Sequence, residues 1–285
     1  LRIIHNIDRS MSEMMLGLES FIPMYMTGQI EPYYFKTPQN GVFLHFMRSA
    51  GTVALTGEAV AGHHSEGRYD LTKAKGEVAY CRRRAEAMLE NASPLMDIYR
   101  EDGAARLNAF LLADSRTPGR RRHILHTPPL CTMEPDCLAA LLEKQGLPEE
   151  NRQRIRAYAR TRREQLETIL LTDTVHLELP RLTERAFAQF PPALPLSGLF
   201  YGQDVPYTYE TYLAHLAQTE AFAAAHPRCE LEFTGGGAFR NLQITIHEGQ
   251  WAMVSKGKSP AIHFVIRHPK LRAAIERFVP PMVEE

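Results

Sequence analysis

Two distant segments of this 285-residue chain share one pattern, and that pattern most limits the folds open to it. Residues 43–58 and residues 242–258 each predict a strand, a glycine-containing turn and a second strand, and an arginine-bearing amphipathic helix follows each of them later. In the second segment Leu242, Ile244 and Ile246 alternate with polar residues, which is the period of a strand. The pattern predicts an α/β protein of the α+β type, with two small sheet-plus-helix lobes. An internal duplication is one hypothesis, and chance recurrence is the other.

The residues between the lobes favour helices. Leucines at 138, 141 and 142 predict a helix that ends near Gly146, and a longer helix is expected to begin at Glu149. Its predicted apolar stripe consists of Ile155, Tyr158, Ala159, Leu166, Ile169 and Leu170. Thr208 is the predicted N-cap of a further helix over residues 209–225. We therefore expect an N-terminal α/β lobe with a leading helix (1–115), a helical middle (116–195) and a C-terminal α/β lobe (196–285).

Charge and cysteine content exclude several classes of protein. Lys plus Arg equals Asp plus Glu at 33 each, so the whole chain has no net field that would attract nucleic acid or anionic lipid. Its apolar runs fall short of the roughly 20 residues that a membrane span needs. The four cysteines are scattered, which does not predict the disulfide framework of a small secreted domain. We expect a cytoplasmic protein with no membrane contact.

A possible zinc site is the sharpest of the local patterns. His123, His126, Cys131 and Cys137 could supply four ligands from one stretch of chain. Their spacing matches no zinc pattern, however, and the prolines between them stiffen the path. A loop with buried cysteines and surface histidines is the favoured explanation, so no metal is expected.

Other catalytic patterns are incomplete. His268 and Lys270 match part of a phospholipase D signature, but apolar Ile275 stands where that signature requires Asp. The glycine-rich residues 234–238 lack the Lys-Ser/Thr that follows the glycines of a P-loop. No nucleophile elbow, metalloprotease motif or Rossmann fingerprint occurs. We therefore expect no cofactor, while an enzyme whose site is assembled from scattered residues stays open.

Arginines are concentrated in residues 82–84, 120–122 and 152–163. Solvated helix faces or contacts with a partner explain most runs of this kind, and acidic residues offset the third. Auxiliary DNA contact by the first or second run is the alternative.

The last third of the chain contains, in order, residues 197–201 (SGLFY), 207–213 (YTYETYL), 251–256 (WAMVSK) and 262–272 (IHFVIRHPKLR). Together they resemble the C-terminal region of XRE-like helix-turn-helix transcriptional regulators of Firmicutes. Residues 53–58 and 68–72 are similar to the middle region of that family. The resemblance implies a bacterial regulator's effector-sensing and dimerisation region, acting as a homodimer.

The resemblance also implies that DNA is bound only through a helix-turn-helix domain, which this chain lacks. Leu1 is neither a start methionine nor part of a signal peptide, so we expect a preceding segment to have been removed. The spacing of Leu1, Ile4 and Ile7 predicts a helix that leads from such a segment.

A pocket for a small-molecule effector of unknown identity is expected where the lobes meet, a common location for ligands. Its predicted lining consists of polar or aromatic residues that interrupt apolar segments: His45, His63, His64, Arg68, Tyr201, Tyr207, Trp251 and His263. A satisfied structural side chain is the other explanation for each, and it is favoured for His45 and His263. The competing functions are a hydrolase or transferase with a site built from these histidines, and a protein-binding scaffold.

Overall fold

The computed structural model describes residues 1–7, 10–37, 41–234 and 241–278. Helices and sheets occur throughout these residues, which confirms the predicted α/β class. The chain divides into two compact units, Leu1–Met96 (unit 1) and Asp97–Glu285 (unit 2). This division differs from the expected three parts, because strands from residues 97–99 and from the supposed helical middle join the same sheet as the C-terminal strands.

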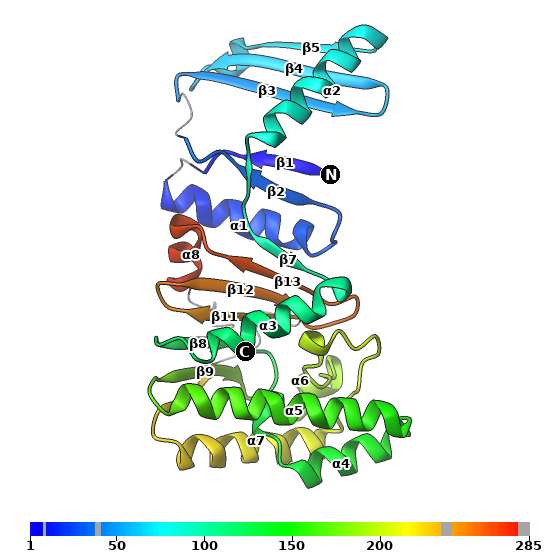
Figure 1. The fold of residues 1–285 in the computed structure, drawn as a ribbon, viewed down its shortest axis with the longest axis vertical. Helices are drawn as coiled ribbons and strands as arrows, with labels where there is room; N and C mark the ends of the chain where they lie inside the picture. The colour runs from blue at the N-terminus through cyan, green and yellow to red at the C-terminus, as the bar shows by residue number, and fades with distance from the viewer. Residues whose placement is uncertain (8–9, 38–40, 235–240, 279–285) are drawn as a thin grey trace. The chain divides into compact units, whose positions relative to one another are not determined.

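Unit 1 contains two sheets in its described residues (Figure 1). Its helices and strands are β1 (Arg2–His5), α1 (Met11–Tyr25), β2 (Glu31–Tyr34), β3 (Phe43–Ala50), β4 (Val53–Val60), β5 (Arg68–Thr72), α2 (Lys75–Glu90) and β6 (Ser93–Pro94). The expected leading helix is wrong at its start: Ile3 and Ile4 belong to β1, which pairs in parallel with β2. Parallel neighbours need a crossover connection, and α1 lies in that connection.

The predicted hairpin at residues 43–58 is confirmed as β3 and β4, and β5 pairs with the other edge of β4. The arginine-bearing helix predicted to follow this hairpin is confirmed as α2. Its residues Val78 and Cys81 are buried against Met47 and Ala54 on one face of this sheet.

Unit 2 is built on a single sheet of seven described strands in the order β10-β9-β8-β11-β12-β13-β7 (Figure 1). The strands are β7 (Asp97–Tyr99), β8 (Arg121–Ile124), β9 (Val175–Pro180), β10 (Cys229–Thr234), β11 (Leu242–His247), β12 (Trp251–Lys256) and β13 (Ile262–Ile266). The helices are α3 (Ala104–Asp114), α4 (Pro135–Lys144), α5 (Glu149–Leu170), α6 (Glu184–Gln189), α7 (Tyr209–Ala225) and α8 (Pro269–Glu276). Single 3₁₀ turns lie at Glu101–Gly103, Leu130–Thr132 and Ser197–Leu199.

The sheet of unit 2 has a parallel half and an antiparallel half. β8, β9 and β10 run parallel, with α4 and α5 in the first crossover and α7 in the second. β11, β12, β13 and β7 are antiparallel. The hairpins β3-β4 and β11-β12 therefore lie in sheets with different strand orders, so the recurrence seen in the sequence does not extend to the observed topology.

The largest core cluster lies where α5 and α7 cover the parallel half of the sheet. The helices contribute Ile155, Leu166 and Tyr212, and β9 contributes Leu177 and Leu179. Figure 1 shows α4, α5 and α7 grouped together in unit 2. None of the described helices is both long and apolar enough to cross a membrane.

Candidate functional site

One face of the seven-stranded sheet directs polar side chains toward the interior of unit 2. Arg121 of β8 lies opposite His247 of β11, and His123 lies opposite Thr245. Successive side chains of a strand point to opposite faces, so these four share one face. The isoleucines of β8 and β11 lie on the other face. Alternation along β8 and β11 therefore gathers Arg121, His123, Thr245 and His247 on one face of the sheet.

A cavity of about 120 Å³ lies between this polar face and the helices α3 and α5. Leucines of both helices form part of its wall. Polar residues on the wall include His123, Tyr158, Arg162, Gln165, Gln243 and Thr245. The cavity is therefore of mixed character, with hydrogen-bonding groups from the strands and from α5.

Asp114, at the end of α3, organises one side of this wall. Its Oδ2 accepts from Nε and from one terminal nitrogen of Arg121, both at 3.2 Å. Its Oδ1 accepts from His247 Nδ1 at 2.7 Å and from Trp251 Nε1 at 2.8 Å. Arg121 is only 1% exposed, so its charge depends on this carboxylate and on nearby carbonyl oxygens.

Arg162 is a second cation on the cavity wall, and its hydrogen-bond partners differ from those of Arg121. It donates to Gln165 Oε1 at 2.6 Å, and within the described residues it has no carboxylate partner. Three other arginines of α5 have such partners, since Arg152 and Arg156 pair with Glu149 and Arg163 pairs with Glu134, whereas Arg154 donates to the carbonyl of Leu199 and Arg160 is exposed.

His123 faces the cavity and is electrically neutral at pH 7. Burial, and then the positive charge of Arg162, lower the pKa of His123 to about 4. Burial raises the pKa of Cys131, also on the wall, to about 11, so its thiol is protonated and a poor nucleophile. The described wall thus holds the Asp114–Arg121 ion pair, neutral polar groups and, at Arg162, one cation without a carboxylate partner.

The predicted site residues fall into three groups. His45, His63, His64 and Arg68 belong to unit 1 and are exposed. Trp251 and His263 lie on the cavity wall in unit 2. Tyr201 and Tyr207 are buried in the main core cluster and are not among the residues that line the cavity.

Tyr207 and His263 have structural hydrogen bonds. The hydroxyl of Tyr207 donates to His215 Nδ1 at 2.8 Å, and His215 Nε2 donates to the carbonyl of Pro129 at 3.2 Å. Ser255 Oγ donates to His263 Nδ1 at 2.8 Å, and His263 Nε2 donates to the carbonyl of Ser197 at 3.0 Å. Both imidazoles are satisfied in their neutral form.

Three further sequence patterns are the possible zinc site, the partial phospholipase D signature and the glycine-rich segment, and the structure describes the first two of them. No three His, Cys, Asp or Glu side chains in the described part of the chain are grouped so as to hold a metal ion. Ile275, which stands where the phospholipase D signature requires Asp, is buried in α8. The glycines at 235–237 lie outside the described residues.

The three arginines of the run 120–122 all have carboxylate partners inside unit 2, although Arg120 is about half exposed. Arg121 is buried against Asp114, and Arg122 forms an ion pair with Glu178 and donates to the carbonyl of Phe278 at 2.8 Å. These two guanidinium groups hold parts of unit 2 together.

Gly198 lets Tyr158 take its place on the wall, because a Cβ at position 198 would lie 2.2 Å from the Tyr158 hydroxyl oxygen. We expect Gly198→Ala to push Tyr158 aside and to lower the free energy of unfolding by about 1 to 3 kcal/mol, the usual cost of overpacking. Gly202→Ala is the matched control, because nothing lies within 4 Å of a Cβ there. Chemical denaturation followed by Trp251 fluorescence measures both. Equal stability of the two variants would contradict the assigned contact.

Arg162, His123 and Gln243 line the cavity but are not among the site residues predicted from the sequence. A signal was present for Arg162, since it interrupts the predicted apolar stripe between Ala159 and Leu166. No family model, curated protein or solved structure matches this chain.

Proposed function

We propose that unit 2 senses a small molecule bound in the cavity between its sheet and the helices α3 and α5. The observation that carries the proposal is the cavity wall itself, where a polar sheet face meets an arginine that lacks a carboxylate partner. Buried polar faces are costly unless hydrogen bonds or a ligand satisfy them. A ligand that supplied such bonds would bind with favourable enthalpy and little rearrangement.

The cavity also adjoins two separate packing clusters, so a bound ligand would contact residues of both clusters. Leu107 and Leu111 of α3 pack with Trp251 and Met253, whereas α5 packs into the larger cluster around Leu177. A ligand in contact with both helices would favour one arrangement of α3 relative to α5. A sensor needs this differential interaction.

The resemblance to XRE-like regulators supports a role for the chain as the effector-sensing part of a transcriptional regulator. In this proposal the chain forms a homodimer, and a separate helix-turn-helix domain contacts DNA. Light scattering should give twice the mass of one chain, and effector should change the dimerisation constant or the hydrodynamic radius. A monomer that is insensitive to every cavity ligand would contradict this part of the proposal.

A hydrolase or transferase is the second candidate, and the Ser255–His263 pair is the observation in its favour. The ring accepts a hydrogen bond from the hydroxyl, as a general base would. Both residues are at most 1% exposed, however, which favours a role in tying β12 to β13. Turnover of any substrate in a panel that Ser255→Ala abolishes, with the fold intact, would establish the enzyme instead.

The sensing proposal is tested by thermal and chemical unfolding with a panel of small molecules. Trp251 is the only tryptophan and lies on the cavity wall, so its fluorescence reports on unit 2. A ligand at a hundredfold excess over its Kd should add about 2.7 kcal/mol to the free energy of unfolding without being consumed. Thr245→Leu, which fills the cavity, should abolish the effect, while the exposed Thr168→Leu should retain it. Ligands that stabilise both variants equally would place the site elsewhere.

A further inference from the structure

The charges around the cavity do not balance. Asp114 is on the wall, but Arg121 and His247 already occupy its oxygens. Arg162 has only the neutral amide of Gln165 as a side-chain partner among the described residues. A cation that is partly removed from water without an anion is unfavourable, and a bound anion would relieve that cost.

The electrostatic influence of Arg162 extends to groups from several elements around the cavity. Its charge lowers the pKa of His263 on β13, after burial, which brings that pKa to about 4. It opposes the burial that raises the pKa of Tyr158 on α5 and of Cys131. It also acts on His123 of β8. Arg162 also lines the cavity, where a ligand can contact it.

The size of the cavity limits the ligand. Its volume of about 120 Å³ is close to the engineered cavity of about 150 Å³ that admits benzene, so it holds roughly six non-hydrogen atoms. Nucleotides and sugar phosphates are larger than this volume. A single unpaired arginine matches a single negative charge, and a guanidinium group matches a carboxylate with two parallel hydrogen bonds.

The wall also provides an apolar side. Leu107 and Leu111 of α3 and Leu166 and Ile169 of α5 line the cavity together with the polar groups. A ligand that satisfies both kinds of wall has a charged end and a short hydrocarbon end.

We infer that the cavity binds a short-chain monocarboxylate, whose carboxylate pairs with Arg162 and whose hydrocarbon end packs against the apolar side chains of α3 and α5. The inference rests on the proposed sensing function and names the class of effector. His123, Gln243 and Thr245 offer further hydrogen bonds to the carboxylate.

Calorimetry and thermal unfolding of the full chain with acetate, propionate, butyrate and hexanoate test this inference. Butyramide, the neutral analogue of butyrate, and inorganic phosphate complete the set. We expect propionate or butyrate to bind at millimolar concentration or below and to raise the Tm, and butyramide to bind at least about tenfold more weakly. Equal binding of butyramide would overturn the inference but leave the sensing proposal standing. Phosphate binding without carboxylate binding would also overturn it.

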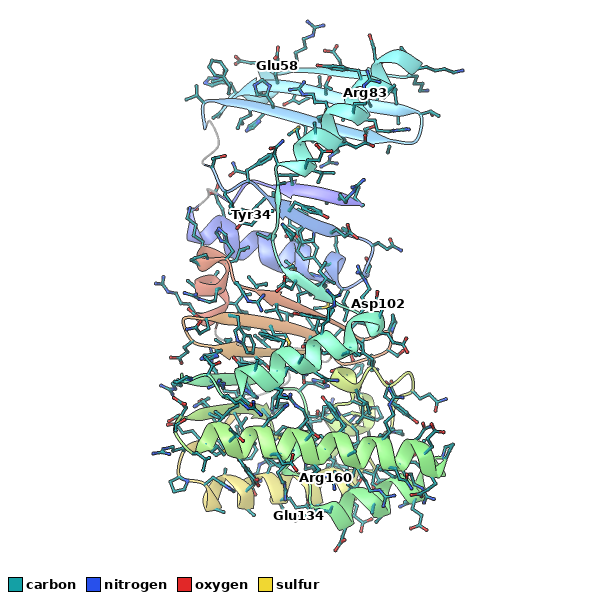
Figure 2. The ribbon with its side chains drawn as sticks, in the orientation of Figure 1. Tyr34, Glu58, Arg83, Asp102, Glu134 and Arg160 are labelled. Atoms are coloured by element: carbon teal, nitrogen blue, oxygen red, sulfur yellow. The ribbon has the colours of Figure 1, made fainter. Side chains whose placement is uncertain are left out.

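Substitutions in α5 test whether the carboxylate of the ligand contacts Arg162. Arg162→Met should reduce butyrate affinity at least about tenfold, while Arg160→Met, at an exposed position labelled in Figure 2, should retain it. Without ligand, Arg162→Met should unfold at the same Tm as the parent chain or higher, because the substitution removes an unpaired cation. Undiminished binding by Arg162→Met, or a large fall in its ligand-free Tm, would overturn the inference. If no compound of the broad panel binds at all, the sensing proposal fails with it.

Discussion

Asp114→Asn is expected to lower the free energy of unfolding of unit 2 by about 3 to 5 kcal/mol, the range found when one partner of a buried ion pair is removed. The substitution keeps the shape of the side chain but removes its charge. Arg121, which is 1% exposed, would lose the only carboxylate within ion-pair distance in the described structure. His247 and Trp251 would also exchange a charged acceptor for a neutral one.

Urea denaturation followed by Trp251 fluorescence measures this effect. Glu248→Gln is the control, because Glu248 pairs with Arg120 at 3.7 Å and both side chains are about half exposed. An exposed pair of this kind contributes about 0 to 1 kcal/mol. A cost for Asp114→Asn no larger than that of Glu248→Gln would show that Asp114 does not hold α3 to the sheet.

Acid should unfold unit 2 between pH 6.5 and about pH 4. Burial lowers the pKa of His263 to about 4 and that of His215 to about 3, and a histidine of the unfolded chain has a pKa near 6.5. In this interval the two histidines bind protons in the unfolded chain but stay neutral in the folded chain, so the free energy of unfolding falls as the pH falls. Each pKa unit corresponds to about 1.4 kcal/mol, so His263 alone removes roughly 3 kcal/mol and His215 somewhat more.

The surroundings of both rings support the direction of this effect. Burial lowers the pKa of His263 most strongly and the charge of Arg162 lowers it further, which outweighs the hydrogen bond to the Ser197 carbonyl that raises it. His215 accepts from Tyr207, whose pKa burial raises well above its ordinary value. That hydroxyl therefore stays protonated as a donor.

A titration of stability against pH checks the prediction. His263→Gln, which can keep both hydrogen bonds but cannot titrate, should reduce the steepness of the loss. The exposed His45→Gln in unit 1 should leave the Trp251 transition unchanged. The same steep loss in His263→Gln as in the parent chain would contradict the role given to His263.

Local sequence patterns predicted much of the secondary structure. Residues 209–225 form α7 with Thr208 as its cap, and α5 begins at Glu149. Capping, helical period and strand alternation act over a few residues, so they can be read without knowledge of the fold.

The sequence patterns did not predict the short strands β8 and β9, which pair in parallel with each other. β8 and β9 lie in residues expected to be a loop and a helical middle, and they are stabilised by partners distant in sequence. The ligand site was expected where two lobes meet. Those lobes were defined by a three-part division of the chain, which differs from the two observed units.

The sequence by itself determined the α/β class, most helices, the two hairpins and the apolar stripe of α5. Only the tertiary structure decided that the polar residues Gln243 and Thr245 of β11 point into the interior, and that Arg162 faces them without a carboxylate partner. The physical reason is that alternation fixes which residues share a face, while the helices that cover that face come from other parts of the chain. Whether an arginine is paired or available for a ligand depends on the same long-range packing.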